Sequence, residues 1–122
     1  MLVSNRAERP AFVTADQSTV RELAHPDWAP EVGHQSLAEA RVPPAGETAE
    51  HFHPESEELY YFLSGSGRMR LGEAVFDVRE GDCVVNPPGV RHKLWNAGPA
   101  ELVLLCCCAP AYSDADTVLT GR

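Results

Sequence analysis

The sequence lacks any apolar run long enough to cross a membrane, and it is poor in cationic side chains. A membrane-spanning helix needs about 20 consecutive apolar residues, and no run of about 18 exists here. Residues 1–10 also contain no apolar core of signal-peptide length. The 122 residues include 10 Lys and Arg against 18 Asp and Glu, a net charge of −8. Such an acidic chain is not expected to bind nucleic acid or an anionic membrane surface.

Cysteines are few, and their positions do not suit a disulfide framework. Three of the four are adjacent, Cys106, Cys107 and Cys108, and the fourth is Cys83. We therefore expect a reduced, cytoplasmic protein. On a strand, Cys106 and Cys108 share one face and Cys107 takes the other, so the three cannot close on one ion. We interpret them as small buried apolar residues.

The pattern of short apolar segments and turns predicts one all-β domain. About eight or nine short strands are separated by Gly/Pro turns, and no segment predicts a long helix. Residues 37–40 would also suit a helix, but the short segment and the following Pro43-Pro44 favour a strand. This pattern indicates a sandwich or barrel. The predicted strands include residues 19–23, 35–42, 68–71, 75–78, 83–85, 90–96 and 101–108.

Two histidines followed by a run of acids form half of a metal site. His51 and His53 are two residues apart, so on a strand they share one face at a separation of about 6.5–7 Å. Two imidazoles at that separation can converge on one ion, about 2.0–2.2 Å from each nitrogen. The run of acids, Glu55, Glu57 and Glu58, can return a carboxylate to the same ion.

A third histidine follows a rigid turn later in the chain. His92 comes shortly after Pro87-Pro88-Gly89. This turn fixes where the next strand begins, which is the support that a metal ligand needs. The chain therefore supplies a second half for the site.

The spacing of these residues resembles the two motifs of the cupin superfamily, in its small single-domain form. The second motif matches at every position. In the first motif, four residues separate Gly46 from His51, where five is the commonest number. The first motif is matched by Gly46, His51, His53, Glu58 and Gly65. The second is matched by Gly81, Pro87, Gly89, His92 and Asn96.

The resemblance implies a cupin jelly-roll β-barrel over residues 31–109, with one divalent transition metal inside. The motif places six residues between its glutamate and its second glycine, and this spacing to Gly65 selects Glu58 among the acids. Strand alternation alone does not decide which acid points inward, because both faces of the strand are apolar. Three imidazoles and one carboxylate suit Fe, Mn, Ni, Zn or Cu, with positions left for substrate or water. The implied ligands are His51, His53, Glu58 and His92.

Outside the barrel, the resemblance carries less information. Residues 1–30 are expected to form an N-terminal strand or arm that packs on the barrel or across a dimer, and residues 110–122 a C-terminal tail. A homodimer is the family expectation, and exposed edge strands give it a physical motive. The turn glycines are expected to supply backbone conformations that a β-carbon would strain, and Asn96 to hold the turn before Gly98.

For function, the resemblance implies a metal-dependent enzyme acting on a small organic molecule, with a dioxygenase as the first prediction. The alternatives are an isomerase, cyclase or lyase acting on a sugar or polyketide, and a cupin that binds a small ligand without catalysis. Tyr60 is the candidate catalytic residue, as a proton or hydrogen-bond donor beside the metal or else as a core aromatic. Arg68 and Arg70 could meet a substrate carboxylate, but we favour a solvated role. For the cysteines at 106–108, the alternative to a role as buried apolar residues is a thiol that lies near the substrate.

Overall fold

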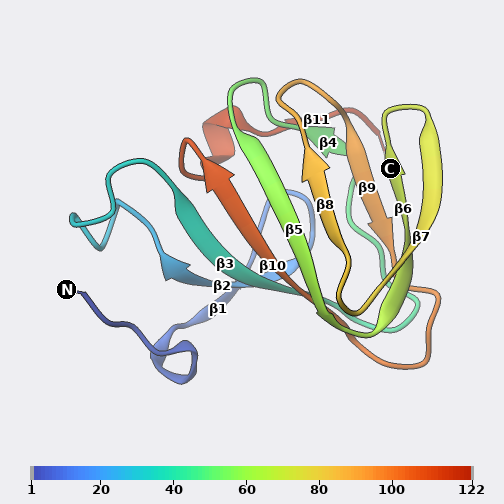
Figure 1. The fold of residues 1–122 in the computed structure, drawn as a ribbon, viewed down its shortest axis with the longest axis horizontal. Helices are drawn as coiled ribbons and strands as arrows, with labels where there is room; N and C mark the ends of the chain where they lie inside the picture. The colour runs from blue at the N-terminus through green and yellow to red at the C-terminus, as the bar shows by residue number, and fades with distance from the viewer. Residues whose placement is uncertain (1, 122) are drawn as a thin grey trace.

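Residues 2–121 of a computed structural model form two antiparallel β-sheets that face one another (Figure 1). The six-stranded sheet has the order β1-β2-β3-β10-β5-β8 and the five-stranded sheet the order β11-β4-β9-β6-β7. The six-stranded sheet contains β1 (Ala11–Val13), β2 (Thr19–Ala24), β3 (Ser36–Val42), β10 (Leu102–Ala109), β5 (Glu57–Ser64) and β8 (Cys83–Asn86). The five-stranded sheet contains β11 (Val118–Leu119), β4 (His51–Phe52), β9 (His92–Trp95), β6 (Ser66–Leu71) and β7 (Ala74–Arg79). Two short 3₁₀ helices are η1 (Arg6–Glu8) and η2 (Asp114–Asp116).

The expected all-β jelly-roll class is confirmed, including the segment that also suited a helix. Residues 36–42 form β3, which pairs with β2 on one side and β10 on the other. Helix propensity is a weak preference that tertiary pairing overrides. Over the described residues 2–121, no helix is long and apolar enough to cross a membrane.

Inward-facing positions change from polar to apolar along the strands. On β5 they run Glu58, Tyr60 and Phe62, the alternate positions of the strand. On β9, His92 is followed by Leu94 two residues later, and both are buried. Because the strands are antiparallel and in register, the polar positions gather at one end of the barrel. The apolar positions form the core at the other end, with Phe62, Met69, Leu94, Leu102 and Leu104 almost fully buried.

The predicted turns form as expected. Gly65, Gly81 and Gly89 all have positive φ, and a β-carbon on Gly65 would lie 2.6 Å from the carbonyl oxygen of Glu101. The backbone N–H of Gly89 donates to the carbonyl of His53 (2.8 Å), so the second motif is bonded to the first. Asn96 Oδ1 accepts from the N–H of Gly98 (3.0 Å), the role expected from the sequence.

Segments near both ends of the described chain add strands to the two sheets. At the N-terminal end, β1 and β2 extend the six-stranded sheet, with β2 paired to β3. At the C-terminal end, η2 leads into β11, which pairs with β4 (Val118 with Phe52, Leu119 with His51). The order of the C-terminal segment was not predictable from its polar sequence, and its contacts lie beside the histidine strand.

Candidate metal centre

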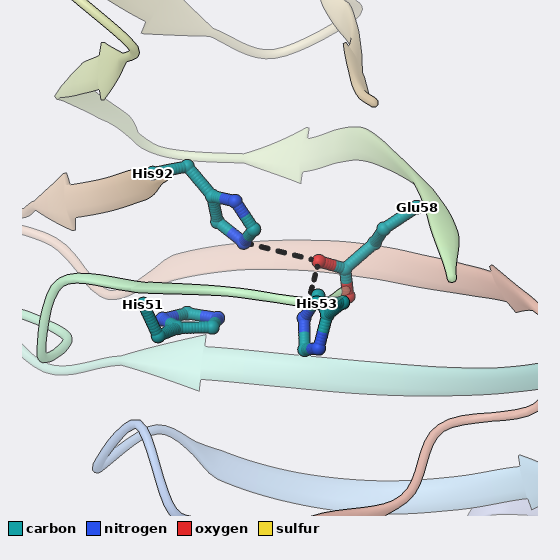
Figure 2. Close-up of side chains that lie close together, drawn as sticks. All are labelled: His51, His53, Glu58 and His92. Atoms are coloured by element: carbon teal, nitrogen blue, oxygen red, sulfur yellow. Dashed lines mark ion pairs between the residues drawn. The ribbon is translucent and has the colours of Figure 1, made fainter. Parts of the chain in front are cut away.

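Four side chains converge at the polar end of the barrel (Figure 2). His51 lies on β4, His53 in the loop after it, Glu58 on β5 and His92 on β9. Each is at most 5% exposed, and one donor atom from each lies within 4.8 Å of the others. We call these four residues the His/Glu cluster. Two facing sheets therefore bring together the residues that the sequence singled out.

Backbone carbonyls fix the orientation of all three imidazoles. The carbonyl partners of the Nδ1 atoms are Ala49 for His51 (2.8 Å), Asp116 for His53 (3.1 Å) and Val90 for His92 (3.3 Å). A carbonyl can only accept, so each Nδ1 carries the proton and donates it. Each neutral ring therefore presents the lone pair of Nε2. This is the arrangement of metal-binding histidines.

The atoms at the centre of the cluster are acceptors that face one another. Glu58 Oε1 lies 3.2 Å from His92 Nε2 and 3.4 Å from His53 Nε2. Within residues 2–121, none of these three buried atoms has a hydrogen-bond partner. Buried acceptors without partners are costly. A cation among them would satisfy all three at once, so the donor set fits a divalent metal.

The electrostatics of the cluster favour an ionised glutamate. Burial would raise the pKa of Glu58, but the adjacent imidazoles of His53 and His92 outweigh it and hold that pKa well below its usual range. Burial would lower the pKa of His53, but the Glu58 carboxylate raises it above its ordinary value. Burial, helped by His92, lowers the pKa of His51 against the opposing charge of Asp16. In the metal-free protein, His53 is therefore the first of these two to take up a proton.

Glu58 has a strand neighbour on each side, and one of them, Cys108, is hydrogen-bonded to its carboxylate. In the sheet, Glu58 stands opposite Cys108 on β10 and Asn86 on β8. The Cys108 thiol donates to Glu58 Oε2 (3.3 Å), which leaves Oε1 for the histidines. Burial and then the Glu58 charge raise the pKa of Cys108, so the thiol keeps the proton that it donates. Asn86 is 1% exposed, and neither polar atom of its side chain has a partner in residues 2–121.

An apolar cavity opens onto the cluster at Glu58. Tyr60, Cys106 and Cys108 line it, as do apolar residues of β2, β3 and β10. It leaves about 50 Å³ for the centres of water molecules, where one water needs roughly 10–15 Å³. The expected alternation is present, since Cys106 and Cys108 share the inner face, but of the three adjacent cysteines Cys108 is buried while Cys106 and Cys107 are half-buried. Cys107 lies on the other face, with its thiol 3.5 Å from Gln35 Oε1.

Tyr60 lies between the cluster and the core. It is 3% exposed, and its ring centre is 5.7 Å from that of His92. Burial, and then the charge of Glu58, raise the pKa of Tyr60 well above its ordinary value. Its phenol therefore stays protonated and is able to donate a hydrogen bond, but not to act as a base near neutral pH.

The two arginines considered for a substrate carboxylate do not line the cavity. Arg68 is exposed and lies 3.5 Å from Asp77, and Arg70 lies 3.9 Å from Glu50. This agrees with the solvated role that we favoured for Arg68, whereas Arg70 is half-buried, with its Nε atom enclosed. The residues that line the cavity therefore offer a ligand no cationic side chain.

Sequence reasoning missed two aspartates at the site. Asp116 approaches His53 through its backbone, and Asp16 Oδ2 lies 3.6 Å from His51 Nε2. The sequence Thr-Ala-Asp-Gln-Ser at 14–18 is typical of a turn, but no spacing rule relates Asp16 in this turn to His51. Both contacts join segments that are far apart in the chain.

Comparisons with known proteins concern the family and the fold of the chain. The family model described as the cupin domain matches residues 38–108, more than half of the chain. A protein of Methanocaldococcus jannaschii, described as uncharacterized, is 46% identical over 106 residues, which is 87% of this chain and 84% of that protein.

Two solved structures share the fold. That of the polyketide cyclase RemF from Streptomyces resistomycificus is 25% identical, with a TM-score of 0.76 over 89% of this chain and 79% of that one. The nucleoside dehydratase Pac13 of Streptomyces is 17% identical, with a TM-score of 0.79 over 99% of this chain and 92% of that one. At that identity, the second likeness concerns the fold alone.

Proposed function

This chain belongs to the cupin family, and from that premise we propose that its His/Glu cluster binds one divalent transition metal in an enzyme site for a small organic molecule. The observation that carries the proposal is the set of facing, unpartnered acceptors His53 Nε2, His92 Nε2 and Glu58 Oε1. Three nitrogens and one carboxylate suit Fe, Mn, Ni, Zn or Cu. When bound in a site with open positions, such a metal polarises a substrate oxygen or activates water or O₂.

The protein's own groups have defined tasks in this proposal. The backbone carbonyls at Nδ1 hold the imidazoles in the binding tautomer, and Cys108 orients Glu58. Tyr60, kept protonated by burial, donates a hydrogen bond to a substrate oxygen and steadies negative charge that develops there. The apolar cavity walls keep bulk water from the reacting group.

For the reaction class, we infer redox-neutral chemistry on an oxygen-bearing substrate, such as cyclisation or elimination of water. The likeness to a polyketide cyclase supports this inference, as does a protonated phenol beside an apolar cavity. The dioxygenase predicted from the sequence is the second candidate. The donor set favours it, because three imidazoles and a carboxylate with open positions suit Fe(II) and O₂.

The experiment begins with protein purified without chelators, whose metal is identified by mass spectrometry. The metal-loaded protein is then incubated with diols, diketones, catechols and poly-β-ketones, with and without O₂. We expect product formation that does not depend on O₂. Bound iron with substrate-dependent oxygen uptake would establish the dioxygenase instead. A metal-loaded protein that binds members of this panel but converts none would contradict the enzyme proposal and support a binding role.

We also propose a homodimer that uses the outer face of the six-stranded sheet. Leu59, Tyr61 and Leu63 on β5 are 37%, 46% and 39% exposed, and Val85 on β8 is 51% exposed. Exposed apolar surface of this kind is typical of an interface. In this single chain β2 pairs with β3 of its own barrel, and its crossing to a partner subunit stays a prediction. A monomer in light scattering would contradict the dimer.

A cytoplasmic location is a further proposal. The four cysteines are free thiols, which suits a reducing compartment.

A further inference from the structure

Asp16 is built into the site by the turn that joins β1 to β2. Its carbonyl accepts from the N–H of Ala49 (2.7 Å), which connects the turn to the segment just before His51. The turn itself is closed by Gln17 N–H to the Thr14 carbonyl (3.0 Å), with Gln17 at a φ of 79°. A positive φ at a residue other than glycine is strained, and it persists where the surrounding structure enforces it. The position of Asp16 is therefore fixed.

The two oxygens of the Asp16 carboxylate have different surroundings. Oδ1 accepts from the N–H of Ser18 (3.0 Å), from the Ser18 hydroxyl (2.7 Å) and from the Thr14 hydroxyl. No donor within residues 2–121 is hydrogen-bonded to Oδ2, which faces His51 Nε2 at 3.6 Å. Since His51 donates through Nδ1, its Nε2 is an acceptor as well. Two acceptors thus face each other, and since Asp16 lines the cavity, a donor from a ligand there would satisfy Oδ2.

The cavity that Asp16 lines has no cationic side chain. Its charged side chains are Asp16, Glu22 and Glu58, with neither Lys nor Arg among the lining residues. The three carboxylates carry three negative charges against the two positive charges of the proposed metal, so a carboxylate ligand entering this cavity would still meet a net negative charge at short range in a medium of low dielectric. A neutral ligand with a hydroxyl group would meet an acceptor with a free lone pair.

We propose that Asp16 determines the substrate class: its Oδ2 accepts a hydrogen bond from a hydroxyl group of a neutral substrate, and its charge excludes carboxylates. This proposal rests on the metal site proposed above and deepens it. Asp16 is not one of the four clustered donors, so we assign it to the substrate and not to the metal. The substrate class is a neutral hydroxyketone or an equivalent hydroxyl-bearing carbonyl compound.

The test compares three small probes that differ in one group. Hydroxyacetone carries a hydroxyl, methoxyacetone replaces it by an ether without a donor, and pyruvate replaces the hydroxymethyl by a carboxylate. Each is titrated into protein loaded with Co(II), and the change in the visible spectrum reports binding without any turnover. For the wild-type protein we expect hydroxyacetone to bind at least about tenfold tighter than either other probe, the effect of one hydrogen bond to a charged group.

The variants isolate the free oxygen. Asp16→Asn keeps an acceptor for Ser18 but turns an amide N–H₂ toward the cavity. We expect the advantage of hydroxyacetone over methoxyacetone to fall to about twofold or less, and pyruvate to bind about tenfold tighter than to wild type. Asp16→Ser keeps a turn-forming side chain and serves as the second variant should Asp16→Asn fold poorly. Glu22→Gln is the matched control for the hydrogen bond, because Glu22 lines the same cavity outside the His/Glu cluster. Its affinity ratio for hydroxyacetone over methoxyacetone should stay that of wild type, while the loss of its charge should also ease the binding of pyruvate.

The outcomes separate this inference from the metal proposal. A wild-type protein that takes up no Co(II) overturns both. A protein that binds Co(II) but shows equal affinity for hydroxyacetone and methoxyacetone, or no response to any probe, overturns the role of Asp16 alone. Loss of Co(II) from Asp16→Asn also overturns it, since Asp16 would then be needed for the metal itself. Asp16 variants that keep the wild-type preference for hydroxyacetone over methoxyacetone would also overturn the role of Asp16.

Discussion

Asp116 joins the C-terminal segment to the site, and Asp116→Ala tests that connection. Its carboxylate accepts from the N–H groups of Glu55 and Ser56 (both 3.0 Å), while its backbone carbonyl accepts from His53 Nδ1 (3.1 Å). The substitution keeps the carbonyl but removes the two bonds that hold it over the imidazole. We therefore expect both stability and metal affinity to fall.

The magnitude follows from the exposure of the two donors. A lost hydrogen bond to a charged group costs about 1.5–3 kcal/mol when the freed donor stays buried. Glu55 is exposed, so its N–H recovers a bond with water, and the more buried Ser56 carries most of the cost. We estimate about 1.5–2 kcal/mol. With an unfolding entropy of about 2.1 cal/mol/K for each of the 122 residues, this lowers Tm by about 6–8 °C. Metal affinity should fall about 10–100-fold, as for other groups that orient a ligand.

Thermal unfolding and a titration against a competing chelator measure the two effects of Asp116→Ala. Asp114→Ala is the matched control, because the side chain of this exposed residue of the same short helix accepts from the Tyr112 hydroxyl (2.8 Å) and, within residues 2–121, forms no hydrogen bond with His53. In a His53→Ala background, Asp116→Ala should change metal affinity no further, since the group that it orients is gone. Lower stability with unchanged metal affinity would refute the proposed connection to His53.

Three further predictions follow from the same contacts. Metal-free protein should lose stability as the pH falls below about 4.5, because the contribution of Glu58, whose pKa is lowered, is complete above pH 4.5 and is lost as the pH falls through that pKa. Around pH 6.5 the raised pKa of His53 and the lowered pKa of His51 act on stability in opposite directions. Denaturant unfolding with chelator from pH 3 to 7 measures the loss, and stability that stays constant from pH 5 to 3 would contradict it. Cys108→Ala should weaken metal binding about tenfold because Glu58 loses the donor on Oε2, whereas Cys107→Ala on the opposite face should not; equal affinities in a chelator titration would argue against the positioning role. Tyr61→Asp should convert the proposed dimer to a monomer in light scattering without loss of metal, and a dimer that persists would place the interface elsewhere.

The parts of the site that were predictable are those whose geometry is local. His51 on the short strand β4 and His53 in the loop just after it share a site because they are two residues apart, and the Pro-Pro-Gly turn positions His92. Glu58 stands out from its acidic neighbours by its distance from Gly65, and the structure buries it while Glu55 and Glu57 are exposed. In each case a few consecutive backbone conformations determine where the side chain points.

The parts that were not predictable depend on contacts between distant segments. The bond from His53 to the Asp116 carbonyl spans 63 residues, and that from Cys108 to Glu58 spans 50. Asp16 reaches the site because β1 and β2 extend the six-stranded sheet toward the cavity. No residue pattern within 110–120 marks this segment as a partner of β4. The pairing of β11 with β4 uses backbone groups, which any sequence offers. The cavity has the same origin, because its lining comes from several strands.

The most direct test of the account is the metal content of protein purified without chelators and measured by mass spectrometry. We predict about one equivalent of a transition metal per chain in the wild type and in Glu57→Gln, the exposed neighbour on the other face of β5. We predict less than about a tenth of that in His92→Ala and Glu58→Gln, with the folded state of each variant verified by circular dichroism. Folded His92→Ala and Glu58→Gln proteins that keep the metal content of the wild type would show that the His/Glu cluster is not the metal site.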